Sequence, residues 1–332
     1  MILDKILQII DAQEEDVKEY LRFIFLTILH SVKITDLKSN SQWPLWTPKQ
    51  NCLEKNIIKV INKKCNDFIK AISYADISLN SDREMVDNFY SLEDGKFMIL
   101  NKPVQSLTQE DLPDDSVDLV ITDPPYLGQV LYSEYMQLYK SFLNLQFNLV
   151  DEIVISSAPS RNKTEEDYYK LLTQAFKTVG RVLKIDKYMC LYFHDANLNV
   201  WDKLIRIMNE CNLKYVSQVH VRKSKNTLKN IISPKKSLNG DAIIFFKKSD
   251  DIMPQDNKIE DVNQIEKEII SIARLIIREQ GCASTPLLYD NGVLEYIINR
   301  GILSELAQLY NDLTEVFDKY LIWDGENGVW KE

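Results

Sequence analysis

The stretch VDLVITDPPYLGQVLY, residues 117 to 132, decides the fold. Its first half is a run of valine, leucine and isoleucine, which is typical of a strand buried on both faces of a sheet. An acid, two prolines and a tyrosine then follow at Asp123, Pro124, Pro125 and Tyr126. Either this tetrapeptide is an ordinary turn that ends a strand, or each of its residues contributes to a binding site.

The sequence around this strand alternates between strand and helix patterns. We expect strands at 97–100, 117–123, 188–195, 213–221 and 241–248, and helices at 2–34, 51–75, 132–146, 164–184 and 199–211. Thr164 and Asp167 have the spacing of a capping box, which marks the start of a helix. Continuous apolar strands that alternate with helices predict an α/β fold with a mainly parallel, doubly wound sheet.

Four regions follow from this pattern. We predict an N-terminal helical region at 1–95, a catalytic α/β domain at 96–250, a polar, acidic linker at 251–263 and a helical appendage at 264–332. The appendage has turn signals at Gly281 and at Asn291-Gly292. It fits either a winged-helix-like module or a structural helical cap.

The composition is that of an ordinary globular protein, with 332 residues, 45% hydrophobic and 27% charged. The formal net charge of −9 does not indicate nucleic-acid binding, although such binding depends on local charge. Five cysteines at unrelated spacings, without a CxxC pair, predict neither a disulfide framework nor a metal site and favour a reducing cytoplasm. The apolar run at 21–29 is too short to span a membrane.

The position of the tetrapeptide suits a ligand site. In open α/β sheets, ligands bind beyond the carboxyl ends of the strands, which is where Asp123 lies. Two prolines fix two φ angles and remove two N–H donors, so that carbonyl groups are left to accept hydrogen bonds from a ligand. Tyr126 can lie flat against a planar ring. Acceptors beside a stacking face suit the exocyclic amino group of a flat heterocycle.

TDPPY after an apolar strand resembles the catalytic motif of the amino-group DNA methyltransferases, which methylate adenine N6 or cytosine N4 with S-adenosylmethionine. The similarity covers about residues 15 to 250 and includes the segments YSEYMQLYKSFL, RVLKIDKYMCLYFHD and KKSLNGDAIIFFKK. It implies a Rossmann-like fold, with Asp123, Pro124, Pro125 and Tyr126 as catalytic residues and Asp123 also bordering the cofactor. The Asp123 carboxylate and the Pro124 carbonyl would bind the amino group and offset its developing positive charge. Tyr126 would stack on a base flipped out of the duplex.

The resemblance also implies further contacts. Tyr132, His194 and Asp195 are candidates for the base pocket. The segment from Val216 to Gly240 contains no acidic residue, so its basic residues are candidates for phosphate contacts. Two basic residues of the loop SAPSRNK, residues 157–163, are candidates as well. The DNA-binding candidates are Arg161, Lys163, Arg222, Lys223, Lys225, Lys229, Lys235 and Lys236.

One part of the family pattern is missing. The family binds the methionine part of its cofactor with a glycine-rich FxGxG-like loop after the first strand, and the nine glycines of this sequence include no GxG pair. In the family's strand order 3-2-1-4-5-7-6, the missing strands lie between those at 97–101 and 117–123. Strand 117–123 would then keep an exposed apolar edge. We therefore expect a split enzyme whose partner chain supplies the cofactor loop.

Alternatives remain from the sequence. A truncated, inactive remnant would also lack the loop. The chain could methylate RNA or another amine, or it could be a non-catalytic DNA-binding or assembly subunit. The leading hypothesis is a DNA methyltransferase subunit of a restriction-modification type system, adenine-specific rather than cytosine-specific, that is active as a heterodimer.

Overall fold

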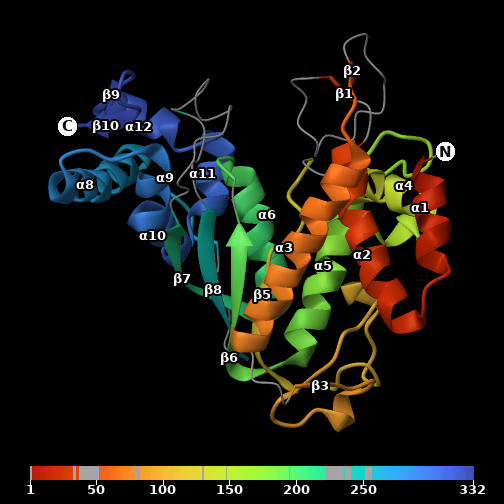
Figure 1. Ribbon diagram of the computed structural model, residues 1–332. Coiled ribbons are helices and arrows are strands. Elements are labelled where there is room, and N and C mark those ends of the chain that lie inside the picture. Colours follow the sequence, from red (N-terminus) through yellow and green to blue (C-terminus); the bar gives the residue numbers. More distant parts are fainter. Residues whose placement is uncertain are drawn as a thin grey trace. The chain divides into compact units, whose positions relative to one another are not determined.

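The computed structural model describes residues 2–32, 35–36, 52–78, 83–128, 131–146, 148–193, 195–221, 235, 241–250 and 256–332. The chain divides into two compact units (Figure 1). Unit 1 comprises residues 1–100, 130–152 and 158–161, and unit 2 comprises residues 101–129, 153–157 and 162–332. The predicted tetrapeptide therefore belongs to unit 2, together with the main sheet.

Unit 1 is mainly helical. Its apolar cluster is built around Phe25, Ile28 and Leu29 of the second helix, which pack with residues of the third and fourth helices. The helical pattern at 2–34 predicts either two helices or one bent helix, and the structure has two, α1 and α2. The elements of unit 1 are α1 (Ile2–Asp11), α2 (Glu15–Val32), β1 (Thr35–Asp36), β2 (Cys52–Leu53), α3 (Ile57–Ser78), β3 (Glu84–Met85), η1 (Phe89–Ser91), β4 (Lys96–Phe97), α4 (Tyr132–Leu143) and η3 (Leu149–Asp151).

Unit 2 contains a four-stranded sheet and the helices that pack on it (Figure 1). Its elements up to the end of the sheet are η2 (Val104–Ser106), β5 (Val117–Thr122), α5 (Glu165–Val182), β6 (Leu183–Phe193), α6 (Leu198–Glu210), β7 (Leu213–Val221) and β8 (Asp241–Lys248). Its later elements are α8 (Val262–Gln280), α9 (Thr285–Leu288), η4 (Tyr289–Val293), α10 (Leu294–Asn299), α11 (Leu303–Leu309), α12 (Thr314–Tyr320), β9 (Ile322–Asp324) and β10 (Val329–Lys331).

The sheet has the order β5-β6-β8-β7. This is the 4-5-7-6 part of the order expected from the resemblance. The prediction of a mainly parallel sheet is confirmed for the strand directions, because β5, β6 and β7 all run the same way. Only β8 is reversed, and it runs antiparallel to both of its neighbours, β6 and β7. An antiparallel strand can follow β7 and enter beside it without a crossover helix. The sequence pattern of β8 does not carry this information.

The predicted strand at 97–100 is reduced to the two residues of β4. It pairs in parallel with β3, in a two-stranded sheet separate from the main one. Within the described residues β5 therefore has one neighbour, β6, and forms an edge of the main sheet.

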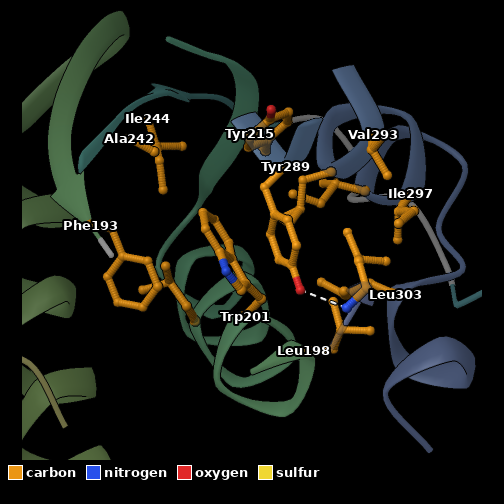
Figure 2. Packing of buried hydrophobic residues seen from close by; sticks show 14 of the residues in the cluster. Phe193, Leu198, Trp201, Tyr215, Ala242, Ile244, Tyr289, Val293, Ile297 and Leu303 are labelled. Carbon is orange, nitrogen blue, oxygen red and sulfur yellow. Dashed lines mark hydrogen bonds between the residues drawn. The ribbon is translucent and has the colours of Figure 1, made fainter. Parts of the chain in front are cut away.

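One face of the sheet is buried. Its central part is Met189, Leu191 and Phe193 of β6 with Ala242, Ile244 and Phe246 of β8. These residues join a core cluster to which α5, α6 and the helices after residue 262 contribute. Figure 2 shows Trp201 of α6 and Tyr289 of η4 in this core, together with Val293, Ile297 and Leu303 of the later helices. The helices after 262 thus complete the core of the sheet.

The opposite face of the sheet carries apolar side chains that are exposed to solvent. Leu119 and Ile121 of β5 are 51% and 66% exposed, and Tyr188 of β6 and Val219 of β7 are exposed as well. The register puts Leu119 beside Tyr188 and Ile121 beside Cys190, so these side chains share a face. We call Leu119, Ile121, Tyr188 and Val219 the open face. A doubly wound sheet would bury both faces, and in this part that prediction is wrong.

Both turns that the sequence predicts after residue 262 are found in the structure. Gly281 ends α8 with a φ of 79°, and Gly292 has a φ of 139° where two helices meet at a kink. The hairpin of β9 and β10 was not predicted. None of the helices in the described ranges is long and apolar enough to cross a membrane.

Candidate active site

The candidate site lies where β5 and β6 end. The two strands are parallel, with Thr122 paired with Leu191, so both carboxyl ends meet at one edge of the sheet. The ring of Tyr126 lies edge-on to that of Phe193, with centroids 6.1 Å apart at 88°. The tetrapeptide after β5 is thus brought against the last residue of β6, as the sequence predicts for a ligand site at this edge.

Two acceptors of the tetrapeptide are unused. The Asp123 carboxylate, on an exposed residue, and the carbonyl of the half-buried Pro124 have no hydrogen-bond partner among the described residues. The Pro125 carbonyl, in contrast, accepts a hydrogen bond of 2.6 Å from the Tyr168 hydroxyl. Because both acceptors lie at the carboxyl end of a strand, where ligands of open α/β sheets bind, they are open to a ligand that donates N–H groups.

The first turn of α5 places Tyr168 beside the tetrapeptide. Thr164 caps the helix: its hydroxyl accepts from the Asp167 N–H, and the Asp167 carboxylate accepts from the Thr164 N–H at 2.8 Å. The hydrogen bonds from Thr164 lower the pKa of Asp167, which keeps the cap charged. The capping box predicted from the sequence is therefore confirmed.

Tyr168 is buried, with 3% of its surface exposed. Burial is the main cause that raises its pKa, and the neighbouring Tyr169 and Asp195 act in the same direction. The hydroxyl therefore stays protonated at neutral pH and can donate to the Pro125 carbonyl. The sequence does not single out Tyr168, because a contact between residues 43 positions apart has no local signal.

The end of β6 carries Asp195. Its carboxylate accepts from the Asn197 N–H at 2.8 Å, and its carbonyl accepts from the Trp201 indole at 2.9 Å. Trp201 also packs edge-on against Phe193 at 5.0 Å. Asp195 is thus held in a turn that directly follows β6. Of the other predicted pocket residues, His194 lies outside the described residues, and Tyr132 is an exposed residue at the start of α4 in unit 1.

Two predicted DNA contacts have carboxylate partners within the chain. The Arg161 side chain is 6% exposed and donates to the Ser133 hydroxyl at 2.9 Å, with Glu152 at 3.3 Å. Lys235 forms an ion pair with Asp318, and its ammonium group lies 5.2 Å from the centre of the Trp330 ring.

The remaining basic candidates are less well defined. Lys163 pairs through its backbone with Ser156. Arg222, Lys223, Lys225, Lys229 and Lys236 lie outside the described residues. Phosphate contact by all of these residues stays a prediction.

The residues that the structure describes do not by themselves fit S-adenosylmethionine. Among the described glycines only Gly128 lies at the carboxyl end of a main-sheet strand, with a φ of 67° and open space around it. A single glycine is not the loop that close approach of the backbone to the cofactor requires. No group of three or more His, Cys, Asp and Glu side chains within the described ranges could hold a metal ion.

An α/β sheet with Asp123, Pro124, Pro125 and Tyr126 at the end of β5 is the arrangement that the resemblance to the amino-group methyltransferases predicts. The family model described as DNA methylase matches residues 117–300, more than half of the chain. The chain belongs to this DNA methylase family. A search of curated proteins finds no match.

Several solved structures are similar to the chain. A proposed DNA modification methylase of Thermus thermophilus, complexed with S-adenosyl-L-methionine, is 14% identical, with a TM-score of 0.26 over 51% of this chain and 63% of that one. The PvuII DNA methyltransferase, which is cytosine-N4-specific, is 14% identical, with a TM-score of 0.30 over 57% and 64%. A SAM-dependent methyltransferase of Methanosarcina mazei is 12% identical, with a TM-score of 0.27 over 54% and 78%. The chain spans less than two thirds of the length of the first of these.

Proposed function

We propose that the chain is the catalytic-motif subunit of a DNA amino-methyltransferase that methylates a flipped base, adenine N6 in preference to cytosine N4. One observation carries this proposal: the Asp123 carboxylate and the Pro124 carbonyl are adjacent acceptors without a partner in the described part of the chain, at the carboxyl end of β5. Membership of the DNA methylase family supports the same reading.

The chemistry of an aromatic amine explains why two acceptors are needed. Its lone pair is delocalised into the ring, so the nitrogen is a poor nucleophile. Hydrogen bonds from its two N–H groups to Asp123 and Pro124 favour a pyramidal nitrogen, and the Asp123 carboxylate offsets the positive charge that develops on it. Tyr126 supplies a face on which the extruded base stacks, because a base inside the duplex cannot reach these acceptors.

The methyl donor in this proposal is S-adenosylmethionine, which supplies an electrophilic methyl group when bound. The chain lacks the glycine loop, so we assign most of the cofactor site to a partner chain. The partner's strand would pair with the free edge of β5 and its helices would cover the open face. The exposed Leu119 and Ile121 support this, because an apolar edge strand in water favours pairing with another chain.

Reconstitution tests the proposal. Radioactive methyl transfer from S-adenosylmethionine to unmethylated plasmid DNA is measured with the chain alone, with the product of the adjacent reading frame alone, and with both. We expect transfer only with both, and we expect digestion of the product to release N6-methyladenine. An RNA substrate in parallel separates the RNA alternative. If the chain alone turns over, or if the pair binds cofactor but methylates no DNA, the proposal is wrong.

A further inference from the structure

The backbone conformation of residues 123–126 is fixed only in part by the tetrapeptide itself. The rings of Pro124 and Pro125 fix two φ angles, but neither proline has an N–H group with which to anchor the loop. The ψ angle of Pro125 is left to be set by whatever its carbonyl binds. In this structure that partner is the hydroxyl of Tyr168, at 2.6 Å from a different element, α5.

The donor is itself firmly placed. Tyr168 stands in the first turn of α5, directly after the Thr164–Asp167 capping box. Its ring is buried in the core cluster and packs edge-on to that of Tyr169, with centroids 5.1 Å apart. The hydroxyl therefore has little freedom, and the carbonyl that it binds points in one direction.

Two consequences follow for the site. With the Pro125 carbonyl directed to Tyr168, the next peptide group is oriented, and with it the start of Tyr126, whose ring rests against Phe193 at 6.1 Å. The Pro124 carbonyl is left for a ligand, since no described residue donates to it. One hydroxyl thus separates the two proline carbonyls into a structural one and a ligand-binding one.

We propose that Tyr168 is the positioning residue of the site, whose hydroxyl holds the Pro125 carbonyl and thereby aims Tyr126 and frees the Pro124 carbonyl for the amino group of the substrate. Its effect on methyl transfer rests on the proposed function. Its effect on the loop conformation does not. The chemical class of ligand is that of the proposed function, a base with an exocyclic amino group.

Tyr168→Phe removes one oxygen and keeps the ring, so it isolates the hydrogen bond. Tyr169→Phe is the matched control: it is the next residue on α5, and its buried hydroxyl has no hydrogen-bond partner in the described part of the chain. Thermal unfolding of both variants checks that each is folded.

Two readouts are needed. Amide hydrogen exchange of the peptide that contains Tyr126, Leu127 and Gly128 reports the loop without any activity. In Tyr168→Phe we expect exchange there to be at least about 5-fold faster than in the wild type, with the β6 peptide unchanged, and no change in Tyr169→Phe. In the reconstituted enzyme we expect kcat to fall about 10- to 100-fold, with KM for DNA within about 3-fold, because a misplacement of about 1 Å costs this order of rate.

The outcomes separate the two claims. If the wild-type pair transfers no methyl group, the proposed function fails, and the exchange experiment still decides the role of Tyr168. If the loop exchanges at the wild-type rate in Tyr168→Phe, or if Tyr169→Phe has the same effect, Tyr168 does not position the loop. If exchange rises but kcat is unchanged, the hydroxyl orders the loop without aiming the site, and the proposal is also overturned.

Discussion

A lysine at Ile121 probes the open face of the sheet. Ile121 is 66% exposed in this chain, so Ile121→Lys removes few contacts from the chain by itself. We expect the free energy of unfolding of the isolated chain to change by no more than about 0.5 kcal/mol, as for other surface substitutions. The variant should also stay folded and become more soluble, because it interrupts an apolar edge.

The effect on the complex should be much larger. Covering the exposed part of Ile121 by a partner would stabilise the complex by up to about 1.5–3 kcal/mol. A lysine at the same place must also be desolvated or must distort the interface, which adds to the loss. Together these effects amount to about 3 kcal/mol, so the dissociation constant should rise about 100-fold.

Two measurements check this reasoning. Urea denaturation gives the stability of the isolated chain, and isothermal titration gives its affinity for the product of the adjacent reading frame. Ile322→Lys is the matched control, because Ile322 is 64% exposed but lies in β9, outside the open face. If the free energy of unfolding of the isolated Ile121→Lys variant falls by more than about 2 kcal/mol, Ile121 is not exposed in the chain by itself. If the affinity for the partner is unchanged, the open face is not part of the interface.

Three further predictions concern the body of unit 2. In Gly180→Ala the new Cβ would lie 2.3 Å from the Cys211 carbonyl oxygen, so we expect a loss of about 1–3 kcal/mol in urea denaturation, although alanine normally favours a helix; a gain in stability would contradict this packing. Burial raises the pKa of the Cys211 thiol to about 12. At pH 8 iodoacetamide should therefore label the half-buried Cys65 and leave Cys211 unlabelled until urea is added. Equal labelling of the two cysteines in the folded chain would contradict this prediction. The Tyr289 hydroxyl donates to the Ala196 carbonyl at 3.1 Å and accepts from the Leu313 N–H at 2.5 Å, the bond drawn in Figure 2. Tyr289→Phe removes both hydrogen bonds and should lower the free energy of unfolding by about 2–4 kcal/mol. Tyr90→Phe, on an exposed ring, should cause no measurable change.

Features with a local cause could be predicted from the sequence. The capping box at Thr164 involves residues three apart, and it is confirmed. The strands at 213–221 and 241–248 are found with the predicted bounds, because clear turn or polar residues flank them. Strand β6 begins at Leu183 instead of residue 188, since the intervening residues 184–188 have side chains largely in solvent and show no apolar pattern.

Features that depend on tertiary pairing could not be predicted in the same way. The place of β8 between β6 and β7 follows from strand pairing, which residue patterns do not encode; only the family resemblance predicts it. The sequence also does not reveal which group a basic residue binds. Arg161 is a basic residue in a loop and is therefore a candidate for a phosphate contact, but in the structure it lies buried beside Ser133 and Glu152.

The candidate site shows both cases. Asp123, Pro124, Pro125 and Tyr126 form one short segment at a strand end, so their position could be predicted from the strand pattern and the prolines. Tyr168 comes from a helix that begins about forty residues later, and a core tyrosine differs from a core phenylalanine only by a hydroxyl whose partner the sequence does not reveal. That hydroxyl decides which proline carbonyl remains available to a ligand.

The most direct test of the account is methyl transfer to DNA by the reconstituted pair that carries Asp123→Ala. Asp118→Ala is the matched control, because Asp118 lies on the same strand and forms an exposed ion pair with Lys184 at 2.8 Å. We predict that Asp123→Ala lowers kcat by at least about 100-fold, as expected when a group that stabilises developing charge is lost, and that Asp118→Ala stays close to the wild type. Methyl transfer at the wild-type rate by Asp123→Ala would contradict the assignment of this carboxylate to the substrate amine.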